Sequence, residues 1–265
     1  MVRDLREELA GRTIVSVEIL RRDIWRSPML DSLDALLPAQ RIVGVDRRGK
    51  YILLELHSGD HLMAHLGMTG HLVVCEPDAP PAKHTHFRAR LDDGRELRFD
   101  DTRRFGRLAY GSRAQLEQAH ALPALGVEPL SDEFTPDALW RLLHPSTRTL
   151  KAALLDQSRV AGLGNIYIDE ACFTAGVRPT RRCNRVTRAQ MTALQSAIRA
   201  TLLSAIVNRG SSVDDYRDVW NAKGTNQERL RVYGRGGQPC LTCNTTLKRT
   251  VVAGRTTVYC PRCQR

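Results

Sequence analysis

The sequence predicts an α+β protein, and three observations along the chain lead to that class. Residues 12–110 show the short alternating apolar patterns of β-strands, whereas the residues that follow show the apolar spacing of helices. Residues 229–265 hold four cysteines in two close pairs and few large apolar side chains. We therefore expect three domains, at residues 1–112, 113–228 and 229–265. The length of 265 residues and the 26% of charged side chains are typical of a folded globular chain.

The first region should begin with a short helix over residues 1–9, which ends at Gly11, and continue as antiparallel strands. The expected strands alternate apolar and polar residues and are separated by turn-forming sequences: residues 42–56 around a turn at 47–50, 61–74 after Ser58-Gly59-Asp60, and 87–91 and 96–99 on either side of Asp93-Gly94. The proline-rich residues 75–81 should form a loop.

The second region should contain two short helices, at residues 149–157 and 166–175, with Asn165 as the cap of the second. The glycine-rich residues 162–167 join them. Free backbone N–H groups at such a turn can hold a phosphate, with Asn165 and Lys151 as further donors. Simple helix capping explains the same pattern, so both interpretations are open at this point.

A longer helix should follow, because Thr187 and Gln190 have the spacing of a capping box. One apolar face runs along it until Gly210 and is formed by residues three or four positions apart: Met191, Leu194, Ile198, Leu202 and Ile206. Residues 211–228 are polar and irregular, and we expect a mobile loop there.

The net charge of +11 suggests a polyanionic partner, although many basic proteins bind nothing specific. The excess is concentrated near the C-terminus. Residues 229–265 contain eight basic residues and no acidic one: Arg229, Arg231, Arg235, Lys248, Arg249, Arg255, Arg262 and Arg265. The apolar runs are too short to span a membrane, and the charged start does not resemble a signal peptide, so we expect a cytoplasmic protein without membrane contact.

The cysteine spacing predicts one structural zinc ion. Two Cys-x2-Cys pairs supply four thiolates for a tetrahedral site with no open position for catalysis: Cys240, Cys243, Cys260 and Cys263. Two disulfides are the alternative, which the odd total of seven cysteines disfavours. Arg255 follows Ala253-Gly254 at the expected hairpin tip, where it could contact a phosphate or simply be solvated.

Two further segments carry residue types that can act on an opened base stack. Arg103 and Phe105 lie close together beside a carboxylate pair, and Met68 lies in a glycine-flanked turn. Burial of Phe105 and Met68 in the core, beside a strand-end salt bridge, is the alternative. Lys50 follows a glycine next to two arginines, and it could act on a substrate proton or be an ordinary surface lysine.

Taken together, these segments resemble the formamidopyrimidine-DNA glycosylase family of bifunctional base-excision enzymes. Six strings match in family order across nearly the whole chain: RRGKY (47–51), HLGMTG (65–70), DTRRFG (101–106), GLGNIY (162–167), VYGR (232–235) and the four-cysteine segment ending in CPRCQ (260–264). The resemblance implies an N-terminal β-sandwich, a helix–two-turn–helix region and a β-hairpin zinc finger, with damaged duplex DNA as the partner of a monomer. It also implies removal of oxidised purines such as 8-oxoguanine and formamidopyrimidines, and it assigns the loop at 211–228 to the extruded base.

The resemblance also implies roles for individual residues. Lys50 and Arg255 match catalytic residues of the β- and δ-elimination steps. DNA contacts are implied for six residues: His84, Arg103, Arg148, Lys151, Asn165 and Arg255. The space left by a flipped base is implied to be filled by Met68, Arg103 and Phe105.

One departure concerns the start of the chain. The family opens with a proline, whose amine is the nucleophile, followed by a glutamate, and neither precedes the Val2-Arg3-Asp4-Leu5 segment here. We expect that Met1 is a mis-chosen start, that the 265 residues as written are inactive, and that the full product is an active glycosylase and lyase. A DNA-binding protein that has lost catalysis is the alternative.

Overall fold

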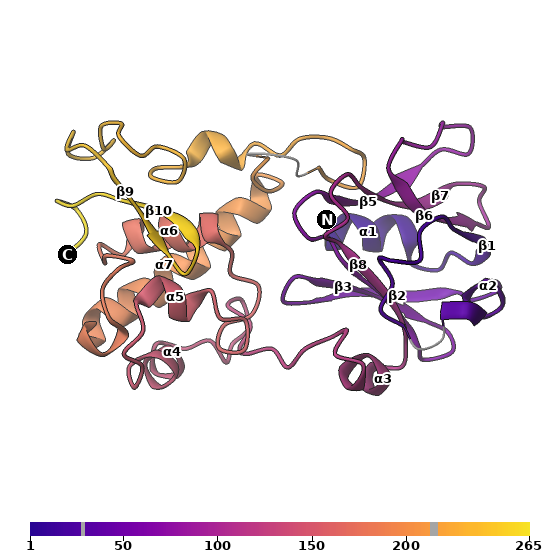
Figure 1. Ribbon diagram of the computed structural model, residues 1–265, viewed down its shortest axis with the longest axis horizontal. Coiled ribbons are helices and arrows are strands. Elements are labelled where there is room, and N and C mark those ends of the chain that lie inside the picture. The colour runs from indigo at the N-terminus through magenta and orange to yellow at the C-terminus, as the bar shows by residue number, and fades with distance from the viewer. Residues whose placement is uncertain (28–29, 213–216) are drawn as a thin grey trace. The chain divides into compact units, whose positions relative to one another are not determined.

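The computed structural model describes residues 1–27, 30–212 and 217–265, and its chain divides into two compact units (Figure 1). The first unit comprises residues 1–124 and 209–225, and the second comprises residues 125–208 and 226–265. The boundaries at 112 and 228 stay a prediction, because these units group the helices with the C-terminal module and place residues 209–225 with the strands.

The first unit is built from two antiparallel sheets of four strands each, with orders β1-β6-β7-β5 and β2-β3-β4-β8. The strands follow the expected alternation, with the bounds β1 Ile14–Ile19, β2 Ile42–Arg48, β3 Tyr51–Leu56, β4 His61–His65, β5 Gly70–Cys75, β6 Thr85–Leu91, β7 Glu96–Asp101 and β8 Arg107–Gly111. Residues 61–74 form two strands in different sheets rather than one. The chain therefore crosses between the sheets at residues 66–69, and it crosses again at residues 102–106.

The core of the first unit draws on both sheets and on helix α1 (Val2–Leu9). Phe87 and Phe99 of one sheet and Leu54 of the other are buried in the same cluster. Helix α1 contributes Leu5, which has no exposed surface, as expected for an amphipathic helix laid on a sheet. Shorter helices complete this unit: η1 (Leu30–Ser32), α2 (Leu33–Leu36) and α3 (Arg113–Gln118).

The described part of residues 209–225 packs onto the first unit. Val219 is fully buried in the core, and its carbonyl accepts a hydrogen bond from the backbone N–H of Val74 at 3.1 Å. The Trp220 indole donates to Glu8 at 3.3 Å. The predicted mobile loop includes residues 213–216, which lie outside the described residues, but residues 218–220 have well-defined partners.

The second unit is helical, with its own apolar core. Its helices are α4 (Pro136–Leu143), α5 (Leu150–Leu154), α6 (Asn165–Thr174), η2 (Cys183–Arg185), α7 (Arg188–Val207) and η3 (Asn226–Arg229). The capping box of Thr187 and Gln190 is confirmed at the start of α7. The predicted cap of α6 is wrong: Gly164 is the N-cap and Asn165 is the first helical residue, so the Asn165 side chain is not used for capping.

A hairpin of β9 (Lys248–Val252) and β10 (Arg255–Tyr259) completes the second unit, and β10 packs on α6. The α+β class, with an N-terminal sandwich, a helical part and a C-terminal hairpin, is thereby confirmed. Across the part of the chain that the structure describes, we find no helix with the length and apolar character needed to cross a bilayer.

Candidate nucleic-acid interface

The four cysteines of the C-terminal module converge on one point. Their sulfur atoms all lie within 4.8 Å of one another, and the closest pairs are 3.4 to 3.9 Å apart. Sulfurs at the corners of a tetrahedron about 2.3 Å from zinc lie about 3.8 Å apart, whereas a disulfide needs about 2.05 Å. The geometry therefore fits one structural zinc ion and excludes the disulfide alternative.

The chemistry of the cysteine cluster also calls for a cation. Hydrogen bonds from Thr245 lower the pKa of Cys243 to about 6, which favours a thiolate. Burial and the neighbouring sulfurs raise the pKa of Cys263 to about 12. Four sulfurs this close cannot all be thiolates unless a cation balances their charge, and Zn²⁺ supplies that balance.

Helix α6 holds this zinc module from two sides through consecutive carboxylates. The backbone N–H of Val258 in β10 donates to Asp169 at 3.0 Å. Glu170 accepts three backbone N–H groups from the segment that enters the module: Arg231 at 2.9 Å, Val232 at 2.9 Å and Tyr233 at 2.8 Å. Sequence analysis missed both carboxylates, although they closely follow the GLGNIY string.

Lys151 lies inside this arrangement rather than on the surface. The residue has no exposed surface, and its Nζ donates to Asp169 at 2.6 Å and to the Thr256 carbonyl at 2.9 Å. Burial lowers the pKa of Lys151 and raises the pKa of Asp169 to about 6, each against the attraction of the opposite charge. The Lys151 ammonium thus holds β10 in place, and the phosphate contact expected for it stays a prediction.

The second unit also carries three other residues expected to contact phosphates: Asn165, Arg255 and Arg148. Arg255 is exposed at the first position of β10, after the Ala253-Gly254 turn. Asn165 lies at the N-terminus of α6, where the backbone N–H groups favour an anion, and the Nδ2 group of its side chain can donate to one. Arg148 is half-exposed and donates to Asp156 at 2.8 Å, so its charge is already paired. Asn165 and Arg255 are therefore the better placed of the three to contact a phosphate.

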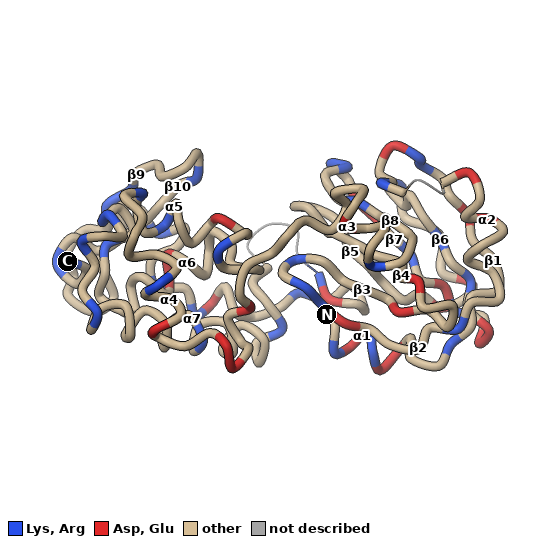
Figure 2. Tube along the Cα trace, turned by 90° about the horizontal axis from the view of Figure 1, so that it is seen from below, with Lys and Arg blue, Asp and Glu red and all other residues tan. Residues whose placement is uncertain are grey.

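The surface around this module is basic. Residues 229–265 have no acidic side chain, and Lys and Arg positions dominate the tube near the C-terminus in Figure 2. A polyanion approaching β9 and β10 meets no carboxylate within this segment, which favours nucleic acid as a partner.

In the first unit, the two crossings between the sheets lie side by side. β5 pairs with β7 through Gly70 and Asp101, and β4 pairs with β8 through His65 and Arg107. A Cβ added to Gly67, where φ is 63°, would lie 2.7 Å from backbone atoms of the other crossing. Only glycine allows the two segments to approach this closely.

The tips of these crossings carry the three residues expected to fill a base-sized space. Met68 is 53% exposed and Phe105 is 50% exposed, so the alternative that they belong to the core is wrong. The Arg103 guanidinium lies 4.7 Å from the Phe105 ring centroid, a cation–π distance. Large apolar side chains held out into solvent beside an arginine suit insertion into a duplex.

Lys50 lies near the same crossings. It is exposed in the turn between β2 and β3, and the next residue, Tyr51, pairs with His65 across the sheet, with ring centroids 4.8 Å apart. Burial, together with the charges of Lys50 and Arg107, lowers the pKa of His65. Lys50 therefore lies next to the strand end that leads into the first crossing.

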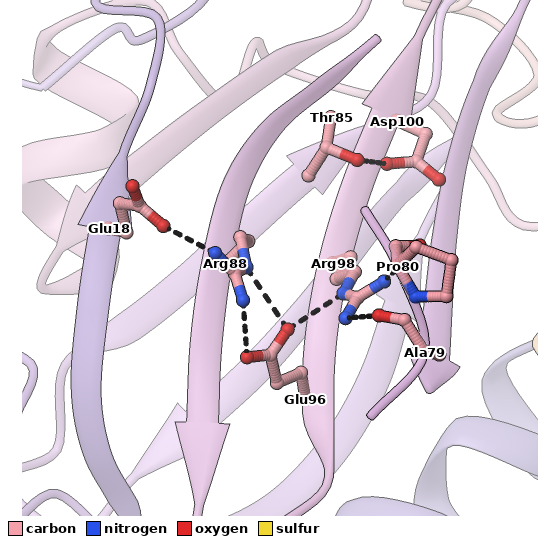
Figure 3. A network of polar contacts seen from close by, with 8 residues as sticks. All are labelled: Glu18, Ala79, Pro80, Thr85, Arg88, Glu96, Arg98 and Asp100. Carbon is pink, nitrogen blue, oxygen red and sulfur yellow. Dashed lines mark hydrogen bonds and ion pairs between the residues drawn. The ribbon is translucent and has the colours of Figure 1, made fainter. Parts of the chain in front are cut away.

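His84 follows a loop that is held by a polar network, shown in Figure 3. Arg98, almost fully buried, donates to the carbonyls of Ala79 at 2.6 Å and Pro80 at 3.1 Å, and it is paired with Glu96. The network thus fixes the loop that precedes His84. Sequence analysis did not single out Arg98, because a lone arginine in a strand carries no distinctive pattern.

The residue after His84 is anchored as well. Thr85 donates its hydroxyl to Asp100 at 2.6 Å across the β6–β7 pair, as Figure 3 shows. His84 therefore lies between a loop fixed by Arg98 and a strand end fixed by Asp100.

The amine of Met1 is also engaged. It donates to the Asp4 carboxylate at 2.9 Å, which closes the start of α1. Burial raises the pKa of Asp4, but the hydrogen bond and charge of this amine outweigh that effect and leave the pKa lowered.

The second unit carries a zinc module with a basic surface, and the first unit exposes an arginine and two large apolar side chains suited to a duplex. Together these features define a zinc-finger nucleic-acid-binding protein. Family models identify it further. Residues 1–108 match the formamidopyrimidine-DNA glycosylase N-terminal domain, residues 125–217 match the formamidopyrimidine-DNA glycosylase H2TH domain, and residues 237–265 match a zinc finger found in FPG and IleRS. The chain belongs to the formamidopyrimidine-DNA glycosylase family of base-excision-repair glycosylases.

Individual relatives agree with this assignment. The formamidopyrimidine-DNA glycosylase of Chloroflexus aggregans is 44% identical, over 100% of this chain and 95% of the relative. The crystal structure of the MutM (FPG) protein of Thermus thermophilus is 42% identical with a TM-score of 0.88, covering 99% of this chain and 95% of that one. A complex between the Lactococcus lactis Fpg and an abasic site containing DNA is 32% identical with a TM-score of 0.91, covering 100% of this chain and 96% of that one.

Proposed function

We propose that this protein removes oxidised purines, such as 8-oxoguanine and formamidopyrimidines, from duplex DNA and cuts the strand at the resulting abasic site. The observation that carries the proposal is the pair of adjacent crossings that hold Met68 and Phe105 half-exposed, with Arg103 stacked beside them. This arrangement supports insertion into the space left by a flipped base. The family membership and the DNA complexes of relatives give independent support.

The remaining assignments are distributed over the two units. Asn165 and Arg255 contact phosphates of the damaged DNA strand, and Lys151 holds β10, the protein strand that carries Arg255. His84 and Arg148 make further contacts with the DNA backbone. Lys50 assists β-elimination beside the phosphate, and Arg255 assists δ-elimination. One copy of the chain carries all of these groups, so we propose a monomer that acts on DNA in the bacterial cytoplasm.

The reaction needs an amine nucleophile, which the resemblance assigns to a proline that is not among these 265 residues. The amine attacks the sugar C1′, the bond from C1′ to the base breaks and the base leaves with a proton, and opening of the C1′–O4′ bond then gives a Schiff base. Loss of a C2′ proton then expels the 3′ phosphate, and a second elimination expels the 5′ phosphate.

The test compares two proteins on a duplex that contains one 8-oxoguanine opposite cytosine. One protein is the 265-residue chain, and the other is extended at its N-terminus by the family's Pro-Glu-Leu-Pro-Glu-Val-Glu-Thr opening in place of Met1. We expect both to bind the duplex and only the extended protein to release the base and cut the strand. Binding without release by the extended protein would instead favour a damaged-DNA-binding protein without catalysis.

A further inference from the structure

Asp101, the last residue of β7, lies between the two crossings and is fully buried. Its carboxylate accepts hydrogen bonds from both of them. From the first crossing, Thr69 donates its hydroxyl to Oδ1. From the second, the backbone N–H of Arg103 donates to Oδ1 at 3.2 Å, and that of Gly106 donates to Oδ2 at 2.7 Å.

The Thr69 hydroxyl closes this arrangement. Besides donating to Asp101, it accepts from the same Arg103 N–H at 3.1 Å. One threonine therefore links the residue after Met68 to the residue that carries the guanidinium. The backbone of Asp101 makes two further hydrogen bonds. Its N–H donates to the His84 carbonyl at 3.0 Å, and its carbonyl accepts from the His86 Nε2 at 2.8 Å.

Burying a carboxylate costs free energy unless hydrogen-bond donors surround it. Moving the donors away from Asp101 would therefore destabilise the fold, and this holds them in place. The donors are the loops themselves rather than a separate cation. Between the two bonded N–H groups, Arg104 has a left-handed φ of 57°, which is unfavourable for a residue other than glycine. The bonds on both sides of Arg104 hold this turn, and the turn directs Arg103 and Phe105 to the same side.

We propose that Asp101 is a positioning residue that sets the spacing and orientation of Met68, Arg103 and Phe105, with Thr69 as its link to the Met68 crossing. It touches no substrate. This role rests on the proposed function, because it assumes that these three side chains enter the duplex. The Asp101 carboxylate thus holds the two crossings together through hydrogen bonds, rather than forming a salt bridge at the surface.

The test uses a duplex with a tetrahydrofuran abasic-site analogue and 2-aminopurine as the opposite base, whose fluorescence changes when side chains insert beside it. Asp101→Asn removes one acceptor with little change in volume, and Thr69→Val removes only the hydroxyl. We expect each variant to lose at least about half of the fluorescence change and about tenfold in affinity for this duplex, while Thr69→Ser restores both. Tyr110→Phe is the matched control, because it removes a hydroxyl that donates to another aspartate of the first unit, Asp60, at 2.8 Å, and this bond involves neither crossing.

Unfolding temperature and zinc content are measured on every variant, so that a loss of folding is recognised. Thr69→Val with a wild-type fluorescence change, or Thr69→Ser without rescue, would overturn the positioning role even if Asp101→Asn failed to fold. A parent protein that binds this duplex no better than an undamaged one would overturn the proposed function first, and the positioning role with it.

Discussion

The two units hold their functional side chains by different means, although each relies on a buried aspartate. In the first unit, Asp101 is surrounded by a hydroxyl and two backbone N–H groups. In the second, Asp169 is paired with the fully buried Lys151, and the strand it holds ends next to a zinc ligand, Cys260. The donors around Asp101 are neutral and belong to the two crossings themselves. The arrangement around Asp169 instead depends on two cations, the Lys151 ammonium and the zinc ion.

This difference predicts where each unit is vulnerable. The crossings of the first unit should keep their geometry as long as the two sheets pair. The face of the second unit that we propose to contact phosphates should depend on zinc and on Lys151. The predictions below separate the two cases, beginning with the largest effect expected on DNA binding.

Removal of zinc should have the largest effect. Residues 229–265 have a small apolar core, so we expect the module to unfold without the metal and specific DNA binding to be lost. Hydrogen exchange should show loss of protection in β9 and β10 while β3 and β4 keep theirs. Native protein with one zinc per chain is the reference. Protection of β9 and β10 that survives chelation would contradict the structural role of the ion.

Breaking the buried ion pair of Lys151 and Asp169 should have the next largest effect, measured as a change in the free energy of unfolding. Lys151→Met leaves the Asp169 carboxylate without its cation, which costs about 3–5 kcal/mol in the free energy of unfolding for a buried pair. The double variant Lys151→Met/Asp169→Leu should recover much of that loss in urea unfolding. Arg188→Met breaks an exposed pair with Asp137 and should cost about 1 kcal/mol or less. Equal losses for Lys151→Met and Arg188→Met would refute the distinction.

Loss of one phosphate contact should have a smaller effect, measured as a change in the free energy of DNA binding. Arg255→Ala and Asn165→Ala should each weaken binding to an abasic-site duplex by about 1–3 kcal/mol. Arg255→Ala should also reduce the slope of log affinity against log salt by about 0.9, because one counterion fewer is released, whereas the neutral Asn165 leaves the slope nearly unchanged. Unchanged affinity for both variants would show that the assigned phosphate contacts are wrong.

Lys50→Ala should have the smallest effect on binding. Lys50 is one exposed charge in the β2–β3 turn, yet the proposal places it beside the reacting sugar. We expect affinity for the abasic-site duplex to stay within about threefold of the parent, a difference of about 0.6 kcal/mol. Strand cutting by the extended protein should slow more strongly. Cutting at the parental rate would remove Lys50 from the chemistry.

The parts of this molecule that sequence analysis predicted are those encoded by local pattern. Cysteine spacing fixes the zinc site, because four ligands at two short intervals have few other geometries available. Alternation and the Asp93-Gly94 turn predict the β6–β7 hairpin, and Thr187 with Gln190 predicts the start of α7. Each of these depends on residues close together in the sequence.

The parts that escaped prediction depend on long-range contacts. The sequence suggests a surface phosphate contact for Lys151, but its partner Asp169 lies on another helix and Thr256 lies far along the chain. Asp101 belongs to a recognised string, yet its bond to Thr69 depends on the pairing of β5 with β7. Asn165 has the residue type of a cap, although Gly164 takes the cap position.

The central claim is that this chain carries the machinery of an amine-dependent glycosylase and lyase, and covalent trapping tests it most directly. Borohydride is added to the extended protein on 8-oxoguanine duplex, and the adduct between protein and DNA is counted by denaturing electrophoresis. We predict a trapped adduct for the extended protein and none above background for the 265 residues as written, among which the family's N-terminal proline is not found. Absence of an adduct with the extended protein, despite tight binding, would contradict the claim, and strong trapping by the 265-residue chain would contradict the assignment of the nucleophile.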